Sequence, residues 1–161
     1  MIRNIVILVV LTQVLAACGV YSFRGALPEG IESVAIPLME NRTSEPLLTE
    51  EITDQVINEF MVQNLFSLED EERADGILEM VLKSITEQAN TYSSEESVSQ
   101  MRLTLNVDVE LLRRTTGESV MRQSFNSWGV YSLEDGERSD GIEEAVNKLV
   151  EDITTALLSG W

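Results

Sequence analysis

Eleven consecutive residues of this chain alternate strictly between apolar and polar side chains, and this pattern constrains the fold more than any other. Every second residue from Met101 to Leu111 is apolar, and the residues between them are polar or charged. Because successive side chains of a strand point to opposite faces, the segment predicts a long strand with one buried face. Such a strand needs neighbouring strands and a covering layer.

The segments around this strand predict a sheet. Residues 120–131 are again extended, and the tight-turn sequence at residues 114–118 predicts that they form a hairpin with residues 101–111. Phe66 and Leu68 predict a short additional strand.

Two further segments complete the predicted sheet. Residues 31–38 alternate as a strand requires, and Pro37 predicts that this strand lies at an edge or ends there. Residues 76–86 are apolar on both faces, which is typical of a central strand. In the first segment, one face is expected to carry Val34, Ile36 and Leu38. In the second, one face is expected to carry Leu78, Met80 and Leu82, and the opposite face Ile77, Val81 and Ile85.

Two segments predict amphipathic helices, from about residue 45 to 63 and from about residue 141 to 158, the second capped by Ser139 or Asp140. Their apolar stripes are Leu48, Ile52, Val56 and Phe60, flanked by Ile57 and Met61, and then Ile142, Val146, Leu149, Ile153 and Leu157. Both helices need a flat apolar surface. The predicted fold is therefore a two-layer α+β sandwich, with two helices packed on one face of a small mixed, mostly antiparallel sheet.

The N-terminal residues predict export and lipid attachment. Arg3 precedes an apolar stretch at residues 5–15 that is too short to span a bilayer, and Leu15-Ala16-Ala17-Cys18 follows. This sequence resembles the lipobox of bacterial lipoproteins, which are cleaved before the cysteine and acylated on it. We therefore expect residues 1–17 to be a signal peptide and Cys18 to be the lipidation site; the alternative is a plain secretory signal with a chance cysteine.

The mature chain divides into a tether and one domain. Residues 18–30 lack periodicity and are expected to form a lipidated tether, followed by a single α+β domain at residues 31–161. Two or more acyl chains anchor a protein stably, since each buried methylene contributes about 0.8 kcal/mol. With the single thiol acylated, no disulfide within the monomer is expected.

The chain is strongly acidic, with a formal net charge of −17. Removal of residues 1–17 takes away only Arg3, so the mature chain would carry 28 acidic and ten basic residues, a net charge of −18. Nucleic acid and anionic lipid surfaces would repel such a chain. We expect no nucleic-acid partner and membrane contact through the lipid anchor, with either a highly soluble surface or a partner that has basic patches.

The residues offer little chemistry for an enzyme. The chain has no histidine, its one cysteine is assigned to lipid, and it lacks a nucleophile elbow and a phosphate-binding glycine loop. The acidic runs 69–72 and 134–137 lack the ligand spacing of a calcium loop and are expected to be solvated loops. We predict no catalytic residue, no metal site and no cofactor; a hydrolase that uses paired carboxylates is the alternative.

Several short motifs follow the cysteine in order. They are Cys18-Gly19-Val20-Tyr21-Ser22-Phe23-Arg24-Gly25, Leu27-Pro28, Val34-Ala35-Ile36-Pro37, Asn41-Arg42-Thr43 and Arg73-Ala74-Asp75-Gly76-Ile77-Leu78. Together they resemble the LptE-like family of lipopolysaccharide-assembly lipoproteins, although Val20 is extra before Tyr21. The resemblance implies two helices packed on a small mixed sheet.

The resemblance also implies a location and a partner. Such a protein sits on the periplasmic side of the outer membrane, inside a large β-barrel translocon, and acts as its plug and assembly partner while lipopolysaccharide is inserted. Gly19, rather than Asp, after the cysteine fits an outer-membrane destination. Tyr21, Phe23 and Arg24, beside the anchor, are candidate partner contacts. The rings of Tyr21, Phe23 and Trp128 would suit contact with a barrel wall, but ordinary core or edge packing is the expected role of Phe23 and Trp128. A freestanding periplasmic lipoprotein that binds a small ligand or cell-wall component is the alternative function.

Direct contact with lipopolysaccharide is a separate expectation of the resemblance. It implies basic residues near a strand-connecting loop, whereas residues 87–99, the expected loop, contain Glu87, Glu95 and Glu96 and no Lys or Arg. The nearest basic candidates are Arg102, Arg113 and Arg114, for which exposed strand-face and turn positions are the alternative.

Overall fold

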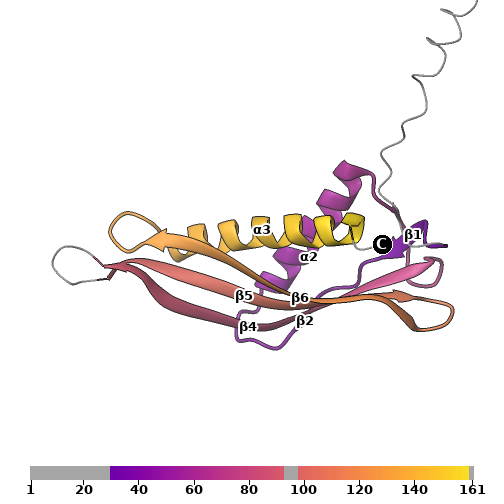
Figure 1. Cartoon of the computed structure of the whole chain (residues 1–161), viewed down its shortest axis with the longest axis horizontal. Helices are drawn as coiled ribbons and strands as arrows, with labels where there is room; N and C mark the ends of the chain where they lie inside the picture. Colours follow the sequence, from indigo (N-terminus) through magenta and orange to yellow (C-terminus); the bar gives the residue numbers. More distant parts are fainter. Residues whose placement is uncertain (1–29, 93–97, 160–161) are drawn as a thin grey trace, which may run out of the picture.

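The computed structural model describes residues 30–92 and 98–159, which form six strands and two helices (Figure 1). The strands are β1 (Ser33–Ala35), β2 (Glu40–Asn41), β3 (Ser67–Leu68), β4 (Gly76–Tyr92), β5 (Val98–Arg113) and β6 (Glu118–Ser132), and the helices are α2 (Leu48–Gln63) and α3 (Arg138–Ser159). The predicted signal peptide and the site candidates Cys18, Tyr21, Phe23 and Arg24 lie outside the described residues.

The strands form one sheet in the order β3-β1-β4-β5-β6, and β2 also pairs with β4. β4, β5 and β6 are long antiparallel neighbours, whereas β1, β2 and β3 make short parallel pairings. The predicted hairpin and the predicted short strand are both confirmed. The sheet is therefore mixed and mostly antiparallel, as predicted.

Both helices cover the same face of this sheet, with α3 lying along β6 (Figure 1). The inward residues of β5 are the predicted ones, and each is at most 1% exposed: Leu103, Leu105, Val107, Val109 and Leu111. The stripes of α2 and α3 join them in a single core. The predicted two-layer sandwich with both helices on one face is confirmed.

A β-bulge at Lys83 changes which residues of β4 face the helices. The pairing with β5 shifts register between Leu82 and Ser84, so the inward residue after Leu82 is Ile85, three positions on. Ile85 packs against the core. The prediction that Ile85 shares a face with Ile77 and Val81 is wrong, because the extra residue of a bulge shifts the alternation by one place.

The first strand is shorter than predicted. β1 ends at Ala35, before Pro37, and it lies between β3 and β4 instead of at an edge. Leu38 is 62% exposed. The prediction that Leu38 shares the buried face of Val34 is wrong, because the chain leaves the sheet before it reaches that residue.

The first helix also differs from its prediction. α2 begins later than expected because Pro46 lies in the turn that precedes it. Met61 is 55% exposed, so the prediction that it widens the buried stripe is wrong. Thr49 and Thr53 are buried instead, and the Thr53 hydroxyl donates to the Thr49 carbonyl at 2.6 Å, which satisfies its polar group.

The second helix begins at Arg138, earlier than predicted. Asp140 therefore caps it from the third helical position: its Oδ2 accepts a hydrogen bond of 2.8 Å from the backbone N–H of Glu137. Ser139 is also inside the helix, and its hydroxyl contacts the Glu137 carboxylate. The prediction that Ser139 or Asp140 is the N-cap residue is therefore wrong, although Asp140 does make a capping hydrogen bond from inside the helix.

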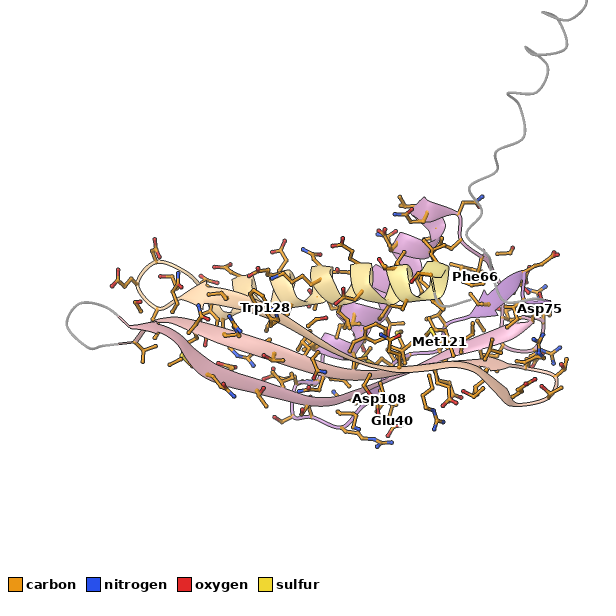
Figure 2. The ribbon with its side chains drawn as sticks, viewed as in Figure 1. Glu40, Phe66, Asp75, Asp108, Met121 and Trp128 are labelled. Atoms are coloured by element: carbon orange, nitrogen blue, oxygen red, sulfur yellow. The ribbon has the colours of Figure 1, made fainter. Side chains whose placement is uncertain are left out.

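Asp75 fixes the start of β1 against the start of β4 (Figure 2). Its Oδ2 accepts hydrogen bonds from the Ser33 hydroxyl at 2.8 Å and from the backbone N–H groups of Ser33 and Glu32 at 3.0 and 3.1 Å. These bonds, the hydroxyl's above all, hold the pKa of Asp75 below its usual range. Arg113 Nη1 donates to the Gly30 carbonyl at 3.4 Å, so the point at which the chain enters the domain is tied down as well.

Candidate functional site

The sheet face turned away from the helices is left uncovered by the two layers (Figure 1). We call it the open face; no helix or strand of the described residues lies over it (Figure 1). The strand register and the ion pairs place equal numbers of acidic and basic residues on it: Glu40, Glu79, Asp108 and Glu110 against Arg42, Lys83, Arg102 and Arg122. The open face is therefore polar and has no net charge.

The charges of the open face are fixed by short contacts. Asp108, which lies away from the helices in Figure 2, accepts hydrogen bonds from the Ser124 hydroxyl at 2.6 Å and from Lys83 Nζ at 3.0 Å. These contacts, the Ser124 bond first, lower the pKa of Asp108. Glu110 pairs with Arg122, which lowers its pKa in the same way. Solvent-exposed pairs of this kind add little stability, so their main effect is to order and neutralise the surface.

The two helices, unlike the open face, carry a net negative charge. α2 has four acidic and no basic residues, and α3 has five acidic and two basic ones, which gives the two helices a net charge of −7. The negative charge of the chain is thus concentrated on the helix side and in loops, away from the open face.

One long edge of the sheet, that of β6, is partly covered by polar side chains of α3. Lys148 Nζ donates to the Trp128 carbonyl at 3.2 Å, and Glu144 Oε2 accepts from the backbone N–H of Val130 at 2.8 Å. The Trp128 ring has Lys148 Nζ at 3.5 Å and the Arg102 guanidinium carbon at 4.4 Å from its centroid. Trp128 thus packs at the sheet edge between two cations.

Two glycines let α3 approach β6 closely enough for this contact. A Cβ atom built on Gly129 would lie 2.0 Å from the Gly141 carbonyl oxygen and 2.9 Å from the backbone nitrogen of Ala145. A Cβ on Gly141 would lie 2.8 Å from the Tyr131 ring. Side chains at these positions would push the helix off the strand.

A second polar cluster joins the start of α3 to β4. Arg138 contacts Glu87 at 2.6 Å and Glu45 at 2.9 Å, and the Tyr131 hydroxyl donates to Glu87 at 2.7 Å. Burial alone would raise the pKa of Glu87, but the hydrogen bonds from Arg138 and Tyr131 outweigh it and lower the pKa. Glu87 is therefore held as a carboxylate.

This cluster borders an open cavity of about 480 Å³ that is also lined by Arg42 and Lys83. Three cations around one hollow would suit an anionic ligand. Each of them is already paired with a carboxylate: Arg138 with Glu45 and Glu87, Arg42 with Glu40, and Lys83 with Asp108. The cavity therefore offers little unsatisfied positive charge.

Comparison with protein families decides where the chain belongs. The model of the LptE family, described as lipopolysaccharide-assembly, matches residues 31–157. The chain belongs to the LptE family. The resemblance predicted from its motifs is thereby confirmed. No curated protein matches the chain.

Solved structures of low sequence identity share the LptE-like fold of this chain. The hypothetical protein CT253 from Chlamydia trachomatis has a TM-score of 0.62 at 10% identity, covering 81% of this chain and 99% of that one. PelC from Paraburkholderia phytofirmans, a dodecamer, has a TM-score of 0.57 at 14% identity and covers 83% and 93%. The uncharacterized lipoprotein B from Nitrosomonas europaea has a TM-score of 0.52 at 13% identity and covers 81% and 86%.

Two of the LptE-like motifs have structural roles. In Arg73-Ala74-Asp75-Gly76-Ile77-Leu78, Asp75 holds the start of β1, as described above. In Asn41-Arg42-Thr43, the Asn41 side-chain oxygen accepts hydrogen bonds from the Thr43 N–H at 2.8 Å and hydroxyl at 2.9 Å, and its amide donates to the Glu45 carbonyl at 2.8 Å. These bonds form the turn that leads into α2.

Two of the three basic candidates, Arg102 and Arg114, occupy the alternative positions named for them, whereas Arg113 is a half-buried residue at the end of β5 that donates to the Gly30 carbonyl. Arg102 is an exposed residue of the open face, and Arg114 Nε donates to the Ala74 carbonyl at 2.6 Å at the β5–β6 turn. The predicted loop at residues 87–99 is wrong in extent, because β4 continues to Tyr92 and places Glu87 in a strand. Residues 93–97 of that loop lie outside the described residues.

The acidic run at residues 69–72 is exposed but has partners that the sequence analysis missed. Arg73 pairs with Asp70 at 2.8 Å and with Glu69 at 3.2 Å. Across residues 30–92 and 98–159, no three His, Cys, Asp or Glu side chains gather as a metal ion would need. Among the same residues, neither helix is long and apolar enough to cross a membrane.

Proposed function

We propose that this chain is an outer-membrane lipoprotein that acts as plug and assembly partner of the β-barrel translocon that inserts lipopolysaccharide into the outer leaflet. The observation that carries the proposal is the LptE-family match over residues 31–157, which covers all but the ends of the described residues. The role is one of contact and assembly, and the proposal assigns no reaction to the chain.

The surfaces of the domain support a place inside a barrel. Barrel lumens are polar, so a plug needs a polar surface with its own hydrogen bonds satisfied. The open face is such a surface: its ion pairs are made within the domain. The helix layer, with its net charge of −7, calls for basic patches on the facing lumen wall.

The anchor is the second part of the proposal. Cys18 carries lipid after removal of residues 1–17, and the tether at residues 18–30 holds the domain on the periplasmic side of the membrane. Tyr21, Phe23 and Arg24, next to the anchor, are the proposed contacts with the barrel. Intact-mass analysis tests the anchor: an unmodified Cys18, or a mature chain that starts elsewhere, would contradict it.

Purification of the intact lipoprotein from outer membranes in mild detergent tests the barrel partnership. We expect one β-barrel protein to co-purify in stoichiometric amount, and depletion of the lipoprotein to leave that barrel misassembled. The matched control is Cys18→Ser, which should keep the fold and lose membrane retention. If the barrel assembles normally and none co-purifies, the chain is not its plug.

The alternative, a freestanding lipoprotein that binds a small ligand or cell-wall component, would need a site in the domain itself. The cavity beside Arg138 is the natural candidate. Its cations are already paired with carboxylates, so the structure gives this alternative less support than the polar open face gives the barrel.

A further inference from the structure

The free edge of β6 has two halves, and only one of them is covered. The Trp128 carbonyl and the Val130 N–H contact α3, so the backbone groups of these residues point away from β5. Along an antiparallel strand, residues whose N–H and C=O groups point toward the paired strand alternate with residues whose groups point away from it. The pairing of β5 with β6 shifts register only at the far end, between Leu111 and Leu112, so the alternation runs unbroken from Val130 back to Arg122.

The N–H and C=O groups of Arg122, Ser124 and Asn126 therefore point out of the sheet. All three residues are exposed, and among residues 30–92 and 98–159 β6 pairs with no strand other than β5. Within the described part of the chain, no hydrogen bond to these outward backbone groups is made. We call residues 122–126 the open edge.

The sequence of α3 explains why its side chains contact the edge of β6 at Trp128 and Val130 but not at residues 122–126. Its residues that reach β6 are four apart: Glu144 and Lys148 contact the edge, and Asp152 Oδ2 accepts from the Ser127 hydroxyl at 3.3 Å. The next position of this row is Ala156, whose methyl group cannot reach a backbone amide. The open edge thus begins where the polar row of α3 ends.

We propose that the open edge binds an extended basic segment of a partner protein as an added strand. Main-chain hydrogen bonds would supply the affinity, and alternate side chains the specificity. This inference goes beyond the proposed function, because it does not require the partner to be a barrel.

The charges around the open edge select a basic occupant. On the helix side lies the exposed residue Asp152, which contacts Ser127 of β6, and α3 has no basic residue after Lys148. Arg122 is already paired with Glu110. A second copy of this chain is disfavoured as the occupant, because two chains with a net charge of −17 repel each other.

Binding of a synthetic peptide to the purified lipoprotein in detergent tests the proposal. The probe is a fluorescent peptide of about nine residues, a common strand length, that alternates lysine and threonine. Fluorescence anisotropy at low salt is expected to show saturable binding, and a peptide that alternates glutamate and threonine is expected not to bind.

A matched pair of variants separates strand addition from simple charge attraction. Ser124→Pro removes an outward N–H without breaking the ladder to β5, since Pro is tolerated where the N–H faces solvent. Ser124→Ala keeps that N–H, and both variants lose the hydroxyl contact with Asp108. We expect Ser124→Ala to bind as the parent does and Ser124→Pro to bind about tenfold more weakly, the effect of roughly one lost hydrogen bond.

Hydrogen exchange on the parent chain gives a second measurement that needs no variant. The amides of Arg122, Ser124 and Asn126 should exchange more slowly when the lysine peptide is bound, while the already bonded Val130 amide should change little. Equal binding to the two Ser124 variants, or unchanged exchange at the open edge, would overturn the proposal. Either outcome would leave co-purification of a barrel as an independent question.

Discussion

The open face and the helix layer handle charge in opposite ways. On the open face, Glu40, Asp108 and Glu110, three of its four acidic residues, form ion pairs. On α2 and α3, Glu144 alone of nine acidic residues does so within the described part of the chain. The open face presents ordered, locally neutral groups, whereas the helix layer presents charge that acts over a Debye length of about 8–10 Å. Contacts made by the helix layer should therefore weaken more with salt than contacts made by the open face.

The largest expected effect is a difference in unfolding free energy between substitutions on the two faces of β5. Leu105→Ala should lower the free energy of unfolding by about 3 kcal/mol, because it opens a cavity beneath the helices where Leu105 is 0% exposed. The neighbouring Thr104→Ala, on the open face, should cost no more than about 0.5 kcal/mol. Urea denaturation measures both values. Similar losses at the two sites would contradict a strand with one buried face.

A somewhat smaller effect tests how closely the layers are joined. Gly129→Ala should destabilise by about 2 kcal/mol, because its Cβ would lie 2.0 Å from the Gly141 carbonyl. Hydrogen exchange of the Val130 amide should also accelerate as α3 shifts and Glu144 withdraws. Asn126→Ala, an exposed control on the same strand, should change neither quantity appreciably. An unaffected Gly129→Ala would mean that the helix is not tightly docked.

The ion pairs of the open face should appear in the pH dependence of stability. The pKa of Asp108 is lowered in the folded state, so its contribution is complete above the unfolded value of about 3.9 and is lost as the pH falls through the folded value. Asp108→Asn should cost about 0.5 kcal/mol at neutral pH and make the acid loss of stability shallower. Identical profiles for Asp108→Asn and the parent would refute this assignment.

The smallest effect is expected in the acidic run. Converting residues 69–72 to Gln and Asn should change stability by no more than about 0.5 kcal/mol, since its pairs with Arg73 are solvent-exposed. Thermal unfolding with and without calcium measures this, and no calcium-dependent shift is expected. A large stabilisation by calcium that disappears in the variant would show a bound ion.

The fold could be predicted because its signals are local. The alternation from Met101 to Leu111 depends only on neighbouring residues, and it defined the half-buried strand correctly. The bulge at Lys83 could not be found in this way, because it exists only in the pairing of β4 with β5. Ile85 was therefore assigned to the wrong face.

The candidate surfaces were harder to predict because they depend on contacts between distant elements. Glu144, Lys148 and Asp152 are visible in the sequence as a polar row beside the apolar stripe of α3. That spacing does not indicate that these side chains contact the edge of β6, or that the contacts stop at Ala156. The lipid anchor is the opposite case. Cys18 is predicted from the sequence alone, and it lies outside the described residues.

The fixed entry of the chain at Gly30 determines how far the domain can move. Arg113 holds the Gly30 carbonyl and Asp75 holds the backbone amides of Glu32 and Ser33, so the tether ends at a defined point. With lipid at Cys18, as proposed, twelve residues span at most about 40 Å. A partner in the same patch of membrane would then meet the domain at an effective concentration in the millimolar range. Surface contacts too weak to survive dilution would suffice there.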